Sequence, residues 1–326
     1  MELESVRELK QTWLSRPTVR EVMGAPRSAV PRGPTAGPLA LGAAPTGSGY
    51  ALAVRYRYDG PLVARLVEQL VAEVGDREVD VRSIGVVRPL TLPGAARPDV
   101  LQGRCRPLVP GCSICHEADT AGTLGAVLDR DGERFLLSNA HVLARGGLAS
   151  PGDLVLQPGP ADGGTAQDRI GVLEWAVPFS SAGGNRVDAA IARPDAGIEV
   201  DLTGAPTATV PLDGDELVEK LGRTTGLTSG RVTAIEVDDV VVDFGEGVGL
   251  LGFDGQVEVS GTGDGPFSRG GDSGSLVREA GGGRAVGLLF AGSERGGDDG
   301  LGLTFCNVVD DVLAALGATL AVEGTG

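Results

Sequence analysis

The chain has 326 residues, enough for one large or two ordinary domains. Hydrophobic residues make up 41% of it, and its 53 glycines and 20 prolines favour many short strands joined by tight turns over long helices. The net charge of −16 argues against a nucleic-acid partner, because a phosphate backbone would be repelled.

The start of the sequence shows no charged segment followed by a long apolar run, and no stretch is long enough to span a bilayer. We therefore expect a cytoplasmic protein with no membrane partner. Four cysteines in this length are too sparse for a disulfide scaffold.

Two segments precede the first expected strand. Apolar spacing predicts a short amphipathic helix over 3–14. The segment 24–49 is rich in Gly, Pro, Ala and Ser, which indicates a linker or an irregular wrap.

A β-α-β unit follows. Alternation predicts a strand over 50–58, a wide apolar stripe after Pro61 predicts a helix, and alternation returns over 78–87. The unit carries no chemical cluster, so we interpret it as a packing or assembly module. The proline-rich segment 88–103 is expected to cross into a larger domain.

Four side chains have the right chemistry for zinc: Cys105, Cys112, Cys115 and His116. The last three also spell C-x-x-C-H, which can attach a c-type haem. The spacing from Cys105 to Cys112 is unusual for zinc, and haem attachment is expected outside the cytoplasm. We favour reduced, partly buried cysteines in a loop and expect no metal and no cofactor.

Further strands are expected over the rest of the chain. The ranges are 122–128, 134–138, 169–175, 230–237, 240–244, 256–259, 276–278 and 285–290, with a terminal helix over 310–320.

His141 follows the expected strand 134–138 and precedes a short helical turn, where it can be held rigidly while reaching a cleft. Asp188 stands where an apolar strand begins. A carboxylate buried there can accept the Nδ1–H of a histidine, fix its tautomer and stabilise the imidazolium. Three other aspartates open no comparable strand: Asp168, Asp195 and Asp201.

Ser273 lies in a glycine-rich loop, R-G-G-D-S-G-S, before an apolar run. Glycine adopts backbone conformations closed to other residues, so such a loop can aim several N–H groups at one point. Those groups can hold an oxyanion while the serine attacks a carbonyl. A tight turn leading into a strand is the alternative for this loop taken alone.

The three stretches together resemble a known family. S-N-A-H-V around His141, V-D-A-A-I-A around Asp188 and G-G-D-S-G-S-L-V around Ser273 resemble the trypsin-like, chymotrypsin-fold serine proteases, in that family's order. The segments P-G-C-S-I-C-H, T-A-G-T-L-G and G-R-T-T-G-L-T-S-G resemble a bacterial subgroup akin to the plant narrow-leaf-type proteases. The resemblance covers about residues 104–320.

The expected fold is therefore mainly β. The resemblance implies a two-barrel chymotrypsin-like protease domain over 104–326, with the site in the cleft between two antiparallel barrels. It is preceded by an N-terminal helix and Gly/Pro-rich linker over 1–49 and by the small α/β module over 50–103.

The same resemblance implies a serine endopeptidase that cleaves protein or peptide substrates through a His141–Asp188–Ser273 triad and an acyl-enzyme. The N–H groups of Gly271 and Ser273 would form the oxyanion hole.

A specificity pocket is expected just before Ser273 and along the strand that ends at 293. Its lining would be Phe267, Ala291, Gly292 and Ser293. Phe267 falls where arginine- or lysine-cleaving members carry an acid, so we expect a small or medium apolar residue before the cut.

The chain departs from secreted family members because about a hundred residues precede the protease domain and no activating cleavage site is evident. Asp272 therefore needs a partner other than a freed N-terminus. The N-terminal module, or contacts in a homo-oligomer, is a candidate for controlling access to the site.

Three other classes stay open. One is a non-catalytic or latent protease-fold scaffold for protein–protein interaction, and another is a metal-binding regulator that uses the cysteine loop. The third is an esterase, which the His-Asp-Ser order opposes because α/β-hydrolases run Ser, acid, His.

Overall fold

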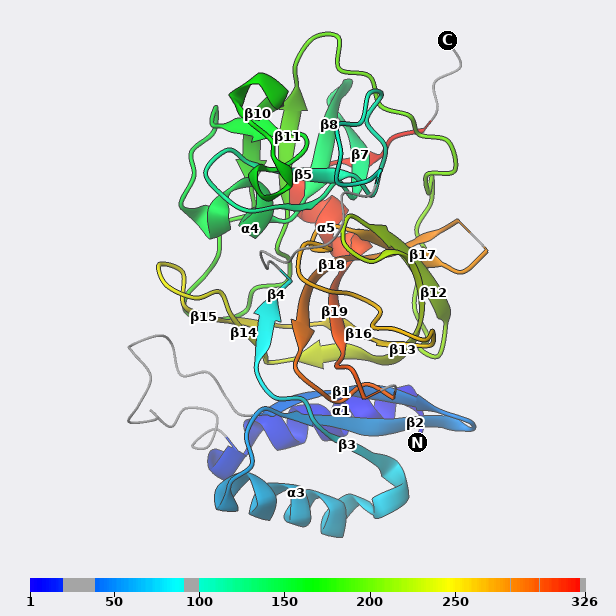
Figure 1. Ribbon diagram of the computed structural model, residues 1–326. Coiled ribbons are helices and arrows are strands. Elements are labelled where there is room, and N and C mark those ends of the chain that lie inside the picture. The colour runs from blue at the N-terminus through cyan, green and yellow to red at the C-terminus, as the bar shows by residue number, and fades with distance from the viewer. Residues whose placement is uncertain (20–38, 91–99, 282, 299, 323–326) are drawn as a thin grey trace.

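The structure is a computed structural model that describes residues 1–19, 39–90, 100–281, 283–298 and 300–322. Two β units and an N-terminal layer are stacked one above another (Figure 1). Short strands dominate, as the glycine and proline content predicts. Within the described part of the chain, no helix has the length and apolar character needed to cross a membrane.

The first unit is one curved sheet with the strand order β20-β7-β8-β11-β10-β9-β5-β6. Its strands are β5 (Ser113–His116), β6 (Gly122–Thr123), β7 (Ala126–Arg130), β8 (Glu133–Ser138), β9 (Leu154–Leu156), β10 (Arg169–Ala176), β11 (Ala190–Pro194) and β20 (Thr319–Leu320). Buried aliphatic side chains from most of these strands fill its interior.

The second unit is a closed six-stranded barrel, because β12, β13, β16, β19, β18 and β17 pair in a complete ring. Its strands, with the attached β14 and β15, are β12 (Leu217–Gly222), β13 (Gly226–Asp238), β14 (Val240–Asp243), β15 (Leu250–Phe253), β16 (Gln256–Gly261), β17 (Leu276–Glu279), β18 (Ala285–Ser293) and β19 (Thr304–Val308). The predicted mainly β, two-barrel chymotrypsin-like fold is confirmed.

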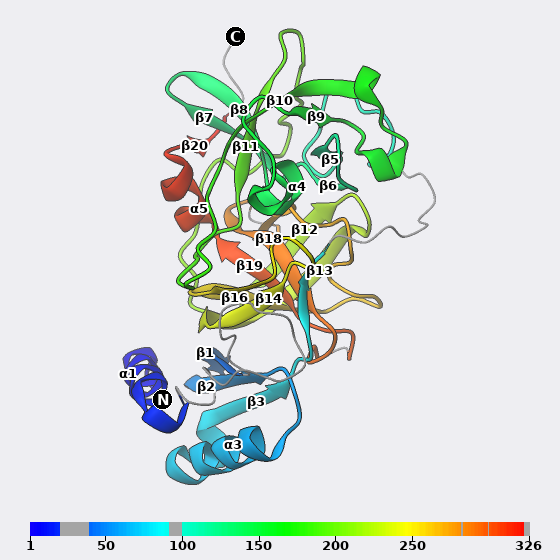
Figure 2. The same cartoon turned by 90° about the vertical axis from the view of Figure 1, so that its left-hand side faces the viewer.

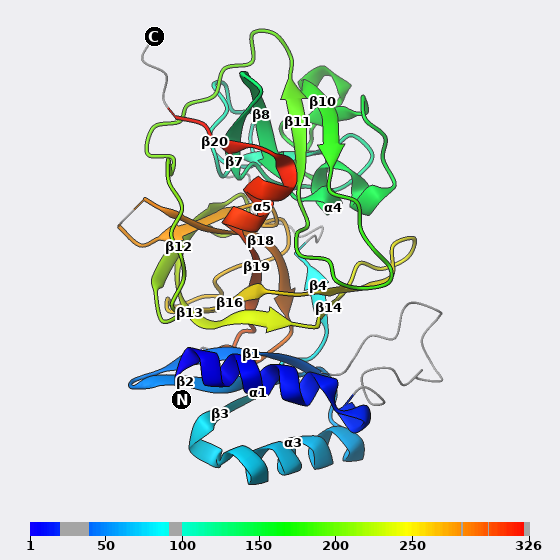
Figure 3. The same ribbon diagram turned by 180° about the vertical axis from the view of Figure 1, so that it is seen from behind.

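Few helices accompany the two barrels. The short α4 (Ala140–Leu143) follows β8, and α5 (Val309–Leu316) packs into an apolar cluster shared by both units (Figure 3). The predicted terminal helix is shorter than expected because Gly317, at φ 61°, ends it in the left-handed conformation. Single 3₁₀ turns are η1 (Asp76–Glu78), η2 (Arg145–Gly147), η3 (Pro160–Asp162) and η4 (Ala166–Asp168).

The N-terminal layer contains the predicted β-α-β unit. Its elements are α1 (Leu3–Ser15), β1 (Leu39–Thr46), β2 (Gly49–Tyr56), α3 (Pro61–Val74) and β3 (Val79–Ser83). Strands β2 and β3 are parallel, and α3 connects them. Helix α3 lies on the side of this sheet away from the barrels, and α1 lies beside β1 and β2 (Figure 2).

The prediction of a linker or irregular wrap over 24–49 was wrong at its C-terminal end. Strand β1 pairs along its whole length with β2 and also with β13 of the barrel. Small residues permit this, since a Cβ on Gly42 would lie 2.8 Å from the Val237 side chain and 2.9 Å from the Ile235 carbonyl oxygen. Most of the predicted linker, residues 20–38, lies outside the described residues.

A fourth N-terminal strand, β4 (Val87–Pro89), lies in the sheet of the second barrel rather than in a crossover. It is parallel to β14 and antiparallel to β18 (Figure 1). Residues 91–99 of the predicted crossover over 88–103 lie outside the described residues. The domain boundaries at 49/50 and 103/104 stay predictions, with β1 and β4 pairing across them.

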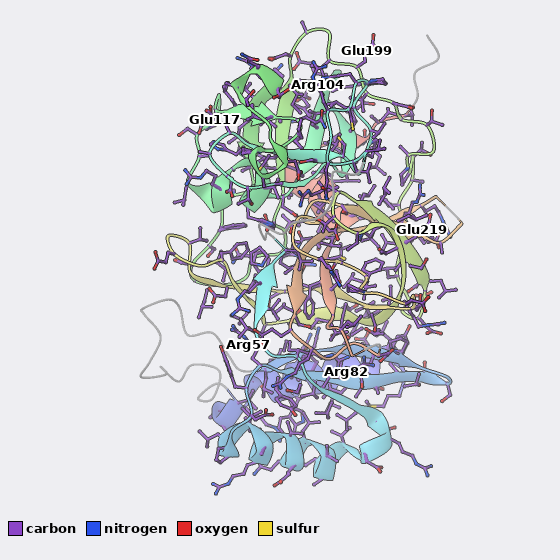
Figure 4. All side chains as sticks on the ribbon, in the orientation of Figure 1. Arg57, Arg82, Arg104, Glu117, Glu199 and Glu219 are labelled. Carbon is purple, nitrogen blue, oxygen red and sulfur yellow. The ribbon has the colours of Figure 1, made fainter. Side chains whose placement is uncertain are left out.

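A buried ion pair ties the N-terminal layer to the barrel. Arg55 on β2 is 0% exposed, and its Nε lies 2.6 Å from Oε2 of the equally buried Glu258 on β16. Its Nη2 also lies 2.7 Å from Asp80 Oδ2. Beside it, Arg82 reaches Asp298 at 2.8 Å, at the junction of layer and barrel (Figure 4).

Helix α1 is fastened to the same barrel by two further cations. Arg7 Nη2 lies 2.6 Å from Glu236 Oε1, and Lys10 Nζ lies 2.8 Å from Asp238 Oδ2. The N-terminal layer is therefore joined to the second barrel by the pairing of β1 with β13 and by ion pairs from both β2 and α1.

The substitution Arg55→Met is expected to lower the free energy of unfolding by about 3–5 kcal/mol, because it leaves the Glu258 carboxylate buried without its cation. The double variant R55M/E258M should recover most of that loss. Chemical denaturation measures both.

The matched control is Arg284→Met. Arg284 pairs with Glu279 at 2.7 Å but is 52% exposed, so the loss should be below about 1 kcal/mol. A cost for R55M no larger than that of R284M would contradict the buried-pair assignment.

Asp239 lies in the turn between β13 and β14, and its carboxyl is partly buried. Burial raises the pKa of this carboxyl to about 6, with the Asp254 and Asp238 carboxylates adding to the effect and Lys10 opposing it. The folded protein thus favours the protonated form. Its contribution to stability is present below the ordinary pKa of 3.8 and is lost as pH rises through about 6.

Asp239→Asn should therefore raise the unfolding free energy by about 1–2 kcal/mol at pH 7.5, with the gain vanishing near pH 4. Asn suits the residue's φ of 60°. Urea denaturation at both pH values measures the gain. Asp131→Asn is the control, since Asp131 also has positive φ but its side chain is 92% exposed. Equal responses of the two variants would contradict the prediction.

Candidate active site

The structure brings His141 and Asp188 together in the first unit. His141 lies in α4 directly after β8, and Asp188 precedes β11, the partner strand of β8. The Asp188 carboxylate is 0% exposed and accepts the backbone N–H of His141 at 3.1 Å and a hydrogen bond from its ring Nδ1. The carboxylate thus fixes both the backbone and the ring of the histidine.

Two asparagines hold Asp188 itself. Asn139 Nδ2 donates to the Asp188 carbonyl oxygen at 2.7 Å, and the Asp188 N–H donates to Asn307 Oδ1 at 2.9 Å. Asn139 precedes α4, whereas Asn307 belongs to β19 of the second barrel. Both units therefore position the carboxylate.

The two histidines of the chain differ in how their ring nitrogens are used. At His116, Nδ1 accepts the Ala118 N–H at 2.9 Å and Nε2 lies 3.2 Å from Asp153 Oδ2, so both nitrogens are occupied. At His141, Nδ1 faces Asp188, and Nε2 has no hydrogen-bond partner among the described residues although it is buried. Of these two side chains, His141 is the one with a ring nitrogen that no described residue occupies.

The cysteine loop does not gather around His116. All four cysteines are free and buried. A hydrogen bond from the Cys112 thiol lowers the pKa of Cys105 to about 7, and the Cys115 thiol donates to the Val142 carbonyl oxygen at 3.5 Å. The described residues contain no cluster of three or more His, Cys, Asp or Glu side chains that could share a metal ion.

The Ser273 loop follows β16 and leads into β17, and two glycines are required for its shape. Gly271 and Gly274 have φ of 95° and 94°. A Cβ on Gly274 would collide with the Ser138 hydroxyl and the Thr123 carbonyl oxygen. Thr123 of the first unit holds the loop directly, because its N–H donates to the Ser273 carbonyl oxygen and its hydroxyl to the Gly271 carbonyl oxygen, both at 2.8 Å.

The Ser273 hydroxyl bonds to backbone of the cleft. It donates to the Phe290 carbonyl oxygen at 3.2 Å and accepts the Leu90 N–H at 3.1 Å. It is not bonded to His141. The Gly271 N–H donates to the carbonyl oxygen of Leu90, so one of the two predicted oxyanion donors already holds a peptide carbonyl.

Asp272, for which the sequence analysis named no partner, contacts a lysine and two backbone N–H groups. Its carboxylate accepts the Thr224 N–H at 2.9 Å and the Arg269 N–H at 2.9 Å, and Lys220 Nζ lies 3.5 Å away. Lys220 is 0% exposed, and burial lowers its pKa while Asp272 opposes that shift. A buried lysine of the same chain thus pairs with the acid before the serine.

The four predicted pocket residues lie in the second barrel. Phe267 is buried in its apolar core. The other three are on β18, directly opposite β4: Ala291 faces Pro89, Gly292 faces Arg88 and Ser293 faces Val87.

Two further residues of the site that the sequence did not predict contact the catalytic groups. The Phe244 ring lies edge-on to the His141 ring, with centroids 5.9 Å apart, and covers it from the end of β14. Leu90 enters from the N-terminal part of the chain. Neither residue stands in a motif, and only the pairing of β4 with β18 brings Leu90 to Ser273.

Comparison with known proteins gives no match to a family model and none to a curated protein sequence. Among solved structures, chymotrypsin-fold serine proteases are similar. Thermobifida fusca protease A is 17% identical, with a TM-score of 0.46 over 66% of this chain and 99% of that protein. A glutamic acid-specific serine protease is 23% identical, with a TM-score of 0.47 over 66% and 100%.

A Nocardiopsis protease is 22% identical, with a TM-score of 0.45 over 66% of this chain and 99% of that protein. HtrA-type proteases are similar at lower identity, 16% for one of them.

Lys220→Met is expected to cost about 3–5 kcal/mol of unfolding free energy, because it leaves the buried Asp272 carboxylate without its cation. Lys10→Met is the matched control, since Lys10 pairs with the more exposed Asp238 and its loss should cost less. Chemical denaturation compares the two. Equal losses would show that Lys220 does not support the loop.

Proposed function

We propose that this protein is a serine endopeptidase in which His141, Asp188 and Ser273 act as base, orienting acid and nucleophile. Two observations carry the proposal: His141 Nε2 has no hydrogen-bond partner among the described residues, and the Gly271 N–H of the Ser273 loop holds a peptide carbonyl. A general base needs a free nitrogen, and acyl transfer needs donors aimed at the carbonyl oxygen.

In the proposed reaction, the Ser273 Oγ–H gives its proton to His141 Nε2 while Oγ adds to the scissile carbonyl carbon. The oxyanion takes hydrogen bonds from the N–H groups of Gly271 and Ser273, each worth about 3–4 kcal/mol in comparable sites. His141 then protonates the leaving amine as the C–N bond breaks. Water repeats the cycle on the acyl-enzyme, and Asp188 stays ionised throughout.

The Lys220–Asp272 pair supports a loop that is assembled without a freed N-terminus. We infer that the intact chain holds its oxyanion loop in shape, unlike a digestive-type zymogen. From its motifs we also assign the protein to the bacterial subgroup akin to the plant narrow-leaf-type proteases, acting on proteins or peptides in the cytoplasm.

One contact favours a second candidate, a latent or non-catalytic protease-fold scaffold. The Ser273 hydroxyl is engaged by Leu90 N–H and Phe290 O instead of by His141. The same contact also fits an active protease whose site is occupied by the Leu90 segment. The protease and scaffold candidates therefore differ in whether Ser273 can react.

A fluorophosphonate probe is expected to label Ser273 and to lose at least about 100-fold in rate in Ser273→Ala and His141→Gln, since nucleophile and base act as a unit. The matched controls are His116→Gln, whose nitrogens are both occupied, and Ser150→Ala at an exposed serine; both should label at the wild-type rate. Mass spectrometry locates the adduct.

The scaffold candidate predicts a different outcome. In that case the probe would label neither folded wild type nor folded Leu90→Asp, a variant that weakens the contact of the Leu90 segment with the Ser273 loop.

A further inference from the structure

A short strand of this chain itself pairs with β18 of the second barrel, beside the Ser273 loop. Strand β4 runs antiparallel to β18, with Val87 opposite Ser293 and Pro89 opposite Ala291. It lies on the strand that carries three of the four predicted specificity residues. An extended peptide that adds a strand to a sheet in this way gains main-chain hydrogen bonds and presents alternate side chains to pockets.

The residue after this strand meets the catalytic groups. The Leu90 carbonyl oxygen accepts the Gly271 N–H, and the Leu90 N–H donates to Ser273 Oγ at 3.1 Å. A carbonyl oxygen on an oxyanion donor, with the nucleophile beside the same residue, marks the peptide bond that a serine protease would attack. That bond is the one following Leu90.

The Leu90 side chain also has a place on the cleft wall. A Cβ on Gly292 would lie 2.8 Å from Leu90 Cδ2, so the glycine leaves room for the leucine. Leu90 packs against the apolar cluster that includes Phe267. Val87 is 0% exposed, and Arg88 points outward to Glu294 at 2.7 Å. The segment is therefore seated by its own side chains.

We propose that Val87–Leu90 is an internal substrate and that the site cuts its own chain after Leu90. This inference rests on the proposed protease function. It also assigns the residue preference of the site, a medium apolar side chain such as leucine, with proline before it.

The step balances as an ordinary peptide hydrolysis. Ser273 Oγ leaves the Phe290 carbonyl, gives its proton to the free Nε2 of His141 and adds to the Leu90 carbonyl carbon. The C–N bond after Leu90 breaks, and His141 returns the proton to the leaving amine. One water molecule then releases the Leu90 carboxylate from Ser273.

Both products stay associated in this account. The fragment 1–90 is held by β1 on β13 and by the Arg55–Glu258 pair, so its C-terminal strand remains on β18. The cut therefore leaves a carboxylate product in the cleft, and other substrates must displace it.

The test follows purified full-length protein over time by intact mass and N-terminal sequencing, with fluorophosphonate labelling of the same samples. We expect a fragment 1–90 and a new N-terminus beginning Thr91-Leu92-Pro93 in wild type and no cut in Ser273→Ala. Leu90→Asp should slow the cut at least about 100-fold, because it puts a charge against an apolar wall. Leu62→Asp, at a leucine 60% exposed on α3, should be cut at the wild-type rate.

The internal-substrate proposal would be overturned if wild type stayed intact, or were cut elsewhere, while the probe labelled wild type or Leu90→Asp. The proposed protease function would then still stand. Absence of labelling in both folded proteins would overturn the two proposals together. The rate should also be independent of protein concentration, since the segment reaches the cleft of its own chain. A rate proportional to concentration would contradict that.

Discussion

The buried carboxylate of Asp188 is the constraint on which the site depends. Taking a carboxylate out of water costs several kcal/mol unless it is paired and fully hydrogen-bonded. Asp188 meets that requirement with the ring and backbone of His141, while Asn139 and Asn307 fix its main chain from the two units. The geometry of the histidine is therefore set by contacts between the two β units, which also hold the Ser273 loop through Thr123.

The N-terminal layer adds further contacts to the second barrel and to the Ser273 loop. Its sheet continues into the barrel through β1, a buried Arg55–Glu258 pair locks the two together, and β4 carries Leu90 to the oxyanion loop. A layer joined this firmly cannot move away from the cleft without breaking a buried ion pair. The contacts thus connect the fold of the first ninety residues to the chemistry of the last hundred.

The sequence predicted those features that local residue chemistry determines. The chymotrypsin-like class followed from three motifs in order, and the β-α-β unit followed from alternation and from the apolar stripe of α3. His141 and Asp188 are in contact because one follows β8 and the other precedes its partner strand β11, so that both lie at one edge of the sheet. Lys220 was not foreseen as the partner of Asp272, since the two residues meet only through the pairing of β12 with β17.

Other features depend on long-range pairing and left no local signal. Strand β1 lies in a segment whose small residues resemble a linker, and its strand character comes from burial between β2 and β13. The place of Leu90 depends on β4 inserting between β14 and β18, more than 150 residues away in the chain. Periodicity and motifs carry no information about such pairings.

The central claim is that His141 and the Gly271 loop activate Ser273 toward a carbonyl-like centre. A crystal structure of the fluorophosphonate-treated protein tests it most directly. The account predicts phosphorus bonded to Ser273 Oγ, an oxygen of the adduct hydrogen-bonded to the Gly271 N–H in place of the Leu90 carbonyl, and His141 Nε2 within hydrogen-bond distance of the adduct. An unmodified Ser273 in folded protein, or an adduct on another residue, would contradict it.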